Sequence, residues 1–450
     1  MNTRKILSTD QVNALETLKD FLLTDEISIT LVGYAGTGKT TIMQDFVYQL
    51  EGMNYNFVLC APTHRAKLVL SQSTNREAIT LHRLLSLSPN IEIYNLDYKD
   101  LMFFSRGSSQ IPHDGIVIID EASMVNDNIY WLLHKYASEN NSKLIFVGDI
   151  SQLSPINETE SKVFNNTNKI TLSKIHRQAE DNPILPVLSE LRTKYKNRFT
   201  DIPNYLYTYW KAEEFIKTSI PYFYHSLKTG NTNGVKILAY TNSRVKGFND
   251  CIRNTLFKEK SSNPYNKFEF LTGYENFEYN GHTYFNSMDY IITNSKKCVK
   301  FIPKFMPLSG YNLTLYDPYE DSNNEIFILD TDINPDHLSF LATLIEETRI
   351  KAIDAKSKNQ KITAGKRWKE YFEILNSFAT PFDLIYDNRV IKNKTFDYGY
   401  AMTVFKAQGS NIDNVFIDIK DINRCKDDNT KRQMQYVGLS RTKNKIFLLQ

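Results

Sequence analysis

The chain has 450 residues, of which 41% are hydrophobic and 23% charged, and none of its apolar runs approaches the length of a membrane span, so we expect two to four globular domains. Lys and Arg (54) nearly balance Asp and Glu (51), and the net charge of +3 neither supports nor excludes a nucleic-acid partner, because a basic groove can lie on a nearly neutral protein. The four cysteines are scattered without a Cys-x-x-Cys pair, which excludes a disulfide framework and a cysteine metal site and predicts a cytoplasmic protein.

The N-terminal elements predict a phosphate-binding loop. A helix is expected over residues 8–22, where apolar residues recur at helical spacing, and a strand over 27–32. Residues 33–40 then match the pattern G-x-x-x-x-G-K-[ST] at every fixed position, and a helix-like run follows. In this context the loop N–H groups face a phosphate, Lys39 would bind the β- and γ-phosphates, and Thr40 would bind Mg²⁺. The residues predicted to contact the nucleotide are Gly33, Gly36, Thr37, Gly38, Lys39, Thr40 and Thr41.

Three further apolar runs predict parallel strands of a doubly wound α/β core, at 57–61, 115–119 and 143–147. Ligands of such sheets gather at the carboxyl ends of the strands. Asp120 and Glu121 directly follow the second run. Asp120 would hold Mg²⁺, and Glu121 would orient and deprotonate the attacking water.

A neutral amide, Gln152, follows the third run. It is predicted to contact the γ-phosphate and to pass on whether that phosphate is present. An isolated Gly-Asp-x-x-Gln segment would favour a simple turn, but its place after the phosphate loop and the acidic pair favours the contact.

The α/β pattern is interrupted twice and then resumes. Residues 86–112 predict a small β-rich insertion. Residues 256–390 predict a larger, aromatic-rich insertion with strand-like pieces and a helical hairpin broken near 361–365. A second α/β core is therefore expected on either side of it, from the strand-like runs 235–240, 414–418 and 445–449.

These segments stand in an order typical of a known family. The chain resembles the superfamily 1 DNA helicases, of the RecD-like branch (superfamily 1B) that includes the Dda-type enzymes. The match is strong over residues 1–180 and 391–450 and thin between them. Its motifs are Gln11, 33–40, 61–67 (APTHRAK), 80–82 (TLH), 120–123 (DEAS), 148–155 (GDISQLSP), 176–178 (HRQ), 240–242 (YTN), 403–410 (TVFKAQGS) and 436–443 (YVGLSRTK).

The resemblance implies an α/β fold of two RecA-like P-loop domains with ATP in the cleft between them. Domain 1A would span residues 1–170, with a β-hairpin insertion, the pin (1B), at 86–112. Domain 2A would span 171–255 and 391–450. The accessory domain 2B, at 256–390, would be an SH3-like β-barrel with a helical projection.

The resemblance also implies roles for residues in these motifs. Arg177 and Arg441 would reach across the cleft as arginine fingers, and Gln11 would read the adenine base through its amide. The residues implied to contact DNA are Thr63, His64, Thr80, His82, Tyr98, Lys406, Gln408 and Ser410.

Two positions carry qualifications. Tyr98 is expected to be the aromatic wedge at the pin tip, and Tyr94, Phe103 and Phe104 are the alternatives. The family usually has His before the Lys of its fifth motif, where this chain has Phe405. The coupling between the DNA contact and the ATP cleft is therefore expected to differ in detail.

The leading hypothesis is an ATP- and Mg²⁺-dependent DNA helicase that moves along single-stranded DNA, 5′ to 3′ by its branch of the family, and unwinds forked duplex DNA in replication or recombination. It would act as a monomer inside a bacterial cell, as a phage or bacterial protein, beside single-strand-binding or replication proteins. The alternative is an ATP-gated remodeller that displaces proteins from nucleic acid without unwinding. A GTPase is disfavoured, because the sequence has no Asn-Lys-x-Asp guanine motif.

Overall fold

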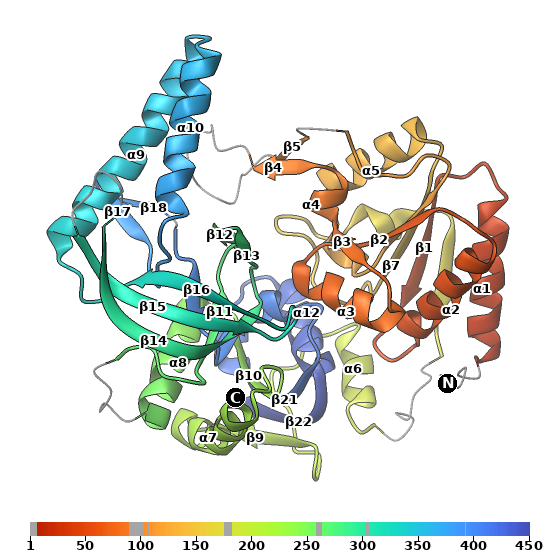
Figure 1. The fold of residues 1–450 in the computed structure, drawn as a ribbon. Helices are drawn as coiled ribbons and strands as arrows, with labels where there is room; N and C mark the ends of the chain where they lie inside the picture. The colour runs from red at the N-terminus through yellow and green to blue at the C-terminus, as the bar shows by residue number, and fades with distance from the viewer. Residues whose placement is uncertain are drawn as a thin grey trace.

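The computed structural model describes residues 7–89, 103–105, 108–174, 182–257, 263–301, 307–391 and 393–450. Figure 1 shows three bodies: an N-terminal α/β body on the right, a second α/β body below, and a β-rich body on the left from which two helices project. We call them domains 1A, 2A and 2B. None of the described helices is both long and apolar enough to cross a bilayer.

Domain 1A is built on a six-stranded sheet in the order β3-β2-β6-β7-β1-β8, with every pair parallel. Its strands are β1 (Ser28–Gly33), β2 (Phe57–Ala61), β3 (Ala78–Thr80), β6 (Ile116–Ile119), β7 (Lys143–Gly148) and β8 (Lys169–Leu172). Its helices are α1 (Thr9–Leu22), α2 (Lys39–Gly52), α3 (His64–Thr74), α4 (Leu81–Leu84) and α5 (Asp127–Glu139).

Alternate residues of each 1A strand enter different cores, because successive side chains point to opposite faces of a sheet. Ile116 and Ile118 pack with α1 and α2, whereas Val117 and Ile119 pack with α5. The sheet is thus covered on both faces, and its free carboxyl edge is left to carry polar residues.

Domain 2A repeats this plan with a five-stranded parallel sheet in the order β20-β10-β21-β22-β9. Its strands are β9 (Leu206–Tyr209), β10 (Val235–Ala239), β20 (Ala401–Thr403), β21 (Ile412–Asp418) and β22 (Thr442–Leu449). Its helices are α6 (Leu185–Leu191), α7 (Ala212–Thr229), α8 (Asn242–Phe257), α11 (Ile419–Ile422) and α12 (Asp428–Ser440). Two parallel α/β cores, the second split by an insertion, confirm the predicted fold class.

Domain 2B is an antiparallel sheet in the order β16-β15-β14-β11-β19, with two small hairpins and a helical hairpin. Its strands are β11 (Phe270–Gly273), β12 (Phe277–Tyr279), β13 (His282–Tyr284), β14 (Asp289–Phe301), β15 (Pro307–Asp317), β16 (Ser322–Leu329), β17 (Leu384–Tyr386), β18 (Arg389–Ile391) and β19 (Phe396–Tyr398). Because β19 pairs with β11, the 2B sheet continues past the predicted boundary at 390. An SH3-like barrel stays a prediction.

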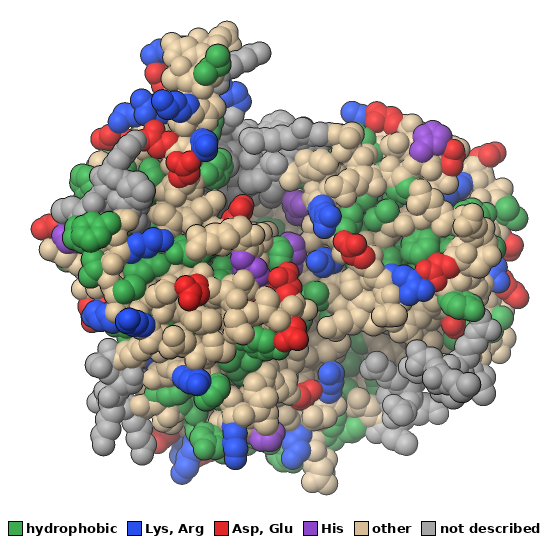
Figure 2. Space-filling model, viewed as in Figure 1, with side chains coloured by type: hydrophobic (Ala, Val, Ile, Leu, Met, Phe, Trp, Pro, Cys, Tyr) green, Lys and Arg blue, Asp and Glu red, His purple; other side chains and the backbone are tan. Residues whose placement is uncertain are grey.

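The helical hairpin consists of α9 (Pro335–Ser357) and α10 (Lys361–Leu375). The predicted break near 361–365 is wrong in position, because α10 already begins at Lys361 and includes Gly365. The chain turns earlier, at Asn359, which has the left-handed φ of 56° that asparagine tolerates well. Acidic and basic side chains mix along this projection (Figure 2). Lys358, Arg367 and Lys369 of the hairpin pair with neighbouring carboxylates, so its basic residues largely form a solvated helix face.

The proposed pin is described in part. β4 (Leu87–Pro89) pairs antiparallel with β5 (Phe103–Ser105), as a hairpin insertion requires. Figure 1 shows this pair at the upper edge of domain 1A, on the side that faces α10. Tyr98 and Tyr94 lie outside the described residues, so the identity of the wedge stays a prediction.

Candidate ATP cleft and strand-binding surface

The predicted phosphate loop joins the buried strand β1 to helix α2. Gly36 and Gly38 both adopt φ of 85°, a conformation that glycine reaches without strain. A Cβ atom on Gly38 would lie 2.2 Å from the Gln11 Nε2 atom, so a side chain here would displace the Gln11 amide and would strain the left-handed backbone. The Lys39 ammonium donates to the carbonyl oxygens of Gly33 (2.5 Å) and Tyr34 (3.1 Å), inside the loop where a phosphate would bind.

Gln11 lies directly against this loop. Its Nε2 donates to the Thr37 carbonyl oxygen at 3.3 Å, and its Oε1 accepts from the Ser8 N–H at 3.0 Å. The second bond completes a capping box at the start of α1. Both ends of the amide therefore have protein partners, and its predicted reading of adenine stays a prediction.

The predicted acidic pair follows β6. Burial and the charge of the neighbouring Glu121 raise the pKa of Asp120, the Glu121 N–H, Lys39 and Arg441 oppose them, and the net pKa is about 6. Glu121 has a left-handed φ of 52°, a conformation that is strained for a glutamate and is of the kind retained at active sites. The Asp120 carboxylate and the exposed Thr40 hydroxyl are hard oxygen donors of the kind that Mg²⁺ prefers. These residues fit the predicted metal.

Arg441 crosses from domain 2A into this site. Its guanidinium donates to Gln152 Oε1 at 2.6 Å and to Glu121 Oε1 at 3.3 Å. The side chain is buried, and its Nε has no hydrogen-bond partner among the described residues. Three predicted residues, far apart in the chain, thus meet at one point. Arg177 lies outside the described residues.

Sequence reasoning missed a second contact across the same cleft. The hydroxyl of Tyr436, on α12, accepts from the N–H of Ala35 in the phosphate loop at 3.1 Å. It also donates to Asp149 Oδ2 at 2.7 Å. One turn earlier on α12, Gln433 exchanges two hydrogen bonds with Ser154. The sequence does carry a signal for these contacts: Gln433 and Tyr436 are polar residues three positions apart, which places them on one face of the helix before Arg441.

The predicted DNA contacts of domain 1A occupy the first turns of α3 and α4. Thr63 and Thr80 cap these helices by accepting from N–H groups two to three residues into the helix. The His64 ring stacks on Phe285 of domain 2B, with centroids 3.8 Å apart. Burial, with the charges of Lys67 and His82, lowers the pKa of His64 to about 4, and burial also lowers that of His82. Neutral imidazoles of this kind suit stacking or hydrogen bonding rather than ion pairing with phosphate.

The predicted DNA contacts of domain 2A are largely inside the protein. Lys406 lies over the Tyr274 ring at 3.8 Å, and burial lowers its pKa to about 8. Gln408 is buried and donates to the Leu153 carbonyl oxygen of domain 1A at 3.3 Å. Ser410 is buried too. Phe405 packs against the 2A core, so an apolar contact stands where the family has its histidine.

Comparison with known proteins shows which families resemble the chain that carries the ATP cleft and the predicted DNA contacts. Residues 6–201 match a family described as an AAA domain, and residues 398–449 match the UvrD-like helicase C-terminal domain. The ATP-dependent DNA helicase Dda of Enterobacteria phage T4 is 22% identical over 98% of both chains. The ATP-dependent RecD2 DNA helicase of Deinococcus radiodurans is 31% identical over 40% of this chain and 23% of its own length. The Pif1 helicase structure from Candida albicans superposes with a TM-score of 0.51 at 16% identity, over 99% of this chain and 94% of that one.

The chain is similar to the helicases of superfamily 1B. Its motifs, their order and the crossing of Arg441 into the phosphate-loop site agree with the expectation from sequence.

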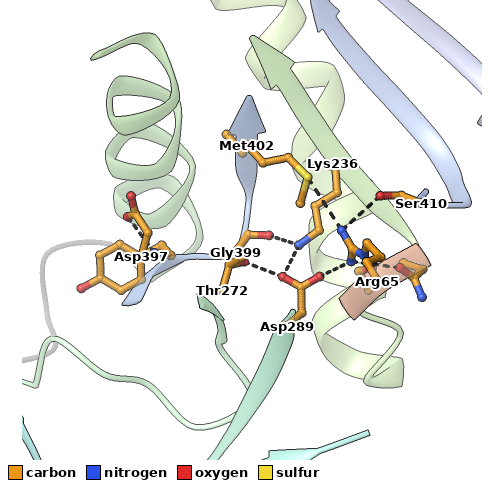
Figure 3. Close-up of polar contacts among 12 residues, drawn as sticks. Arg65, Lys236, Thr272, Asp289, Asp397, Gly399, Met402 and Ser410 are labelled. Carbon is orange, nitrogen blue, oxygen red and sulfur yellow. Dashed lines mark hydrogen bonds and ion pairs between the residues drawn. The ribbon is translucent and has the colours of Figure 1, made fainter. Parts of the chain in front are cut away.

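This helicase has a feature that its motifs did not predict, a buried ionic network joining all three domains (Figure 3). Arg65 of α3 pairs with Asp289 of domain 2B at 2.9 Å, and Lys236 of β10 pairs with the other oxygen of that carboxylate at 2.9 Å. Arg65 also donates to Ser410 Oγ at 3.3 Å, and Lys236 donates to the Gly399 carbonyl oxygen.

All three charged side chains of this Arg65 network are buried. Both cations lower the pKa of Asp289 against the opposing effect of burial, so the carboxylate is ionised. The Arg65 network therefore holds α3 against domains 2A and 2B, at the same contact where His64 of α3 stacks on Phe285 of domain 2B.

Proposed function

We propose that this helicase hydrolyses ATP with Mg²⁺, moves 5′ to 3′ along single-stranded DNA and separates the strands of a forked duplex. The observation that carries the proposal is the contact of Arg441, from domain 2A, with Glu121 and Gln152 of domain 1A. A nucleotide held by domain 1A would be sensed and completed by domain 2A, so binding and hydrolysis would change how the two domains sit.

Each residue of the cleft has a chemical task in this scheme. Lys39 binds the β- and γ-phosphates, and Glu121 accepts a proton from the attacking water. Arg441, with Arg177 as a second candidate, neutralises charge that develops on the transferred phosphoryl group. Thr40 and Asp120 would hold Mg²⁺, which would supply positive charge beside the phosphates.

The substrate and setting are supported by the relatives. Dda and RecD2 are DNA helicases by name, and Dda matches along nearly the full length of both chains. We propose single-stranded and forked DNA as substrates, a monomer as the active form and single-strand-binding or replication proteins as partners. Its four cysteines are unpaired, which fits a proposed intracellular site of action.

A forked duplex with one single-stranded tail tests the proposal. With ATP and Mg²⁺, a 5′-tailed fork should be unwound and a 3′-tailed fork should not, and single-stranded DNA should stimulate ATP hydrolysis. Lys39→Ala should abolish both activities while it leaves the thermal unfolding midpoint near that of the wild type. Absence of strand separation together with absence of DNA-stimulated hydrolysis would reject the proposed function. Unwinding of the 3′-tailed fork alone would show movement from 3′ to 5′ and reject the proposed direction.

The pin has its own test. The antiparallel pairing of β4 with β5 supports a hairpin here. Tyr98→Ala should slow unwinding while DNA-stimulated ATP hydrolysis persists, because a stacked base gains about 1–3 kcal/mol, comparable with opening one base step. Tyr94→Ala serves as the matched control. A loss of unwinding in Tyr94→Ala alone would move the wedge to that residue.

A further inference from the structure

Tyr436 stands in an unusual place for a structural tyrosine. Its side chain is fully buried, and its hydroxyl joins the phosphate loop of domain 1A to Asp149 of the same domain, although the residue itself belongs to domain 2A. The acceptor side of the hydroxyl faces the Ala35 N–H, and its proton goes to the Asp149 carboxylate.

The Ala35 N–H is a group that a phosphate-binding loop normally offers to its ligand. Successive N–H groups of such loops converge on phosphate oxygens. Ala35 comes before the two left-handed glycines and helix α2, and it faces domain 2A, the side from which Arg441 enters. Asp149 is also next to this point, because its backbone oxygen accepts from the N–H of Gln152, the residue that Arg441 contacts. Because an arginine finger acts on the transferred phosphoryl group, the side of the loop from which Arg441 enters is the side expected to meet the outermost phosphate.

A tyrosine oxygen that accepts from this N–H does what an oxygen of the γ-phosphate would do. The Asp149 carboxylate holds the hydroxyl proton, which leaves the oxygen lone pairs directed at Ala35. Burial and Asp149 also raise the pKa of Tyr436 far above its ordinary value, so the group stays a neutral phenol.

We propose that Tyr436 is a positioning residue that occupies the γ-phosphate place on the Ala35 N–H when no nucleotide is bound and yields it when ATP arrives. This rests on the proposed ATP hydrolysis. Tyr436 keeps its hydrogen bond to Asp149 with and without ATP, and it loses the hydrogen bond from Ala35 when ATP binds. Because Tyr436 and Arg441 lie on and at the end of the same helix, α12, its release shifts the arginine finger as the γ-phosphate enters. ADP has no γ-phosphate and leaves the contact in place.

Tyr436→Phe tests this by equilibrium binding, measured by calorimetry in Mg²⁺ with ATPγS and with ADP as separate probes. The variant should bind ATPγS about five-fold more tightly than the wild type, the size of one ordinary hydrogen bond, and ADP equally well. The DNA-stimulated kcat should fall together with the KM for ATP, because the nucleotide binds before Arg441 is placed. Tyr207→Phe is the matched control, a tyrosine of the same domain whose ring stacks on Phe447 of the 2A core. It should change neither affinity.

The ratio of the two affinities decides the outcome. It is measured on one protein, so a general loss of stability does not move it. An equal change for ATPγS and ADP, or weaker binding of ATPγS, would overturn the role of Tyr436 and leave it as a plain domain contact. Failure of the wild type to bind either nucleotide would instead defeat the proposed function.

Discussion

Domain 1A contacts its neighbours through the Arg65 network and through the ATP cleft, and the two differ in how many of their polar groups have partners. In the Arg65 network each charge has a close partner: Asp289 binds two cations, and Lys236 adds a backbone carbonyl. In the ATP cleft, the buried Nε of Arg441 and the buried hydroxyl of the nearby Ser123 have no hydrogen-bond partner in the described part of the chain.

This difference separates a structural joint from a ligand site. Leaving a buried polar group without a partner costs about 1–3 kcal/mol, so a ligand that satisfied the Arg441 Nε would bind more favourably. The cleft is incomplete by itself, whereas the Arg65 network is complete. The role of a buried arginine is therefore indicated by the N–H groups that have no partner as well as by the hydrogen bonds that the guanidinium makes.

The largest effect is expected from Arg441→Ala. Loss of the guanidinium should lower kcat of DNA-stimulated ATP hydrolysis by about 10³–10⁵, or about 4–7 kcal/mol, because the charge acts on the developing phosphoryl group. Single-turnover hydrolysis measures it. Lys443→Ala removes a nearby cation that pairs at the surface with Asp413, and this control should keep its activity. A fall of less than ten-fold in Arg441→Ala would mean that the cleft is not completed from domain 2A.

Asp289→Asn should have the next largest effect, on stability rather than on chemistry. It leaves Arg65 and Lys236 buried without their anion, at a cost of about 3–5 kcal/mol. Denaturant unfolding measures the loss. Glu347→Gln breaks an exposed pair with Lys351 and should cost about 0–1 kcal/mol. Equal stability of the two variants would show that the Arg65 network does not stabilise the contact between the domains.

Lower pH should weaken Mg²⁺ binding at the cleft, because the metal needs the Asp120 carboxylate and the pKa of that group is about 6. Half of the sites are protonated at that pH, and below it the apparent affinity should fall about ten-fold for each unit. Because the folded pKa lies above the ordinary value, the metal-free protein should lose stability as pH rises from 3.8 to about 6. Mg²⁺ titrations between pH 5 and pH 8 measure the first effect. A constant affinity over this range would exclude Asp120 as the ligand.

The smallest effect is expected from Gln11→Ala. It removes the Gln11 half of the capping box of α1 and the contact with the Thr37 carbonyl oxygen. It also removes the predicted hydrogen bond to adenine, worth about 1 kcal/mol, so ATP should bind about five-fold more weakly. Calorimetry with ATPγS measures it. Gln44→Ala, on the exposed face of α2, is the control and should bind as the wild type does. An unchanged affinity in Gln11→Ala would leave Gln11 with a structural role in α1 alone.

The sequence by itself determined the phosphate loop, four of the six described strands of the domain 1A sheet, three of the five described strands of the domain 2A sheet, and the polar residues that follow them. These depend on local chemistry: two glycines at left-handed φ, apolar runs, and acids directly after a strand. Lys39, Asp120, Glu121 and Gln152 therefore lie where the pattern predicts, around one carboxyl edge of a sheet.

Only the tertiary structure decided which distant residues meet. Tyr436 touches Ala35 across 401 positions, and Arg65 reaches Asp289 across 224. Gln408 and Ser410 fit a strand-binding motif, yet they are buried at domain contacts. The physical reason is that burial and partners depend on how the domains pack, and short stretches of sequence do not record that packing.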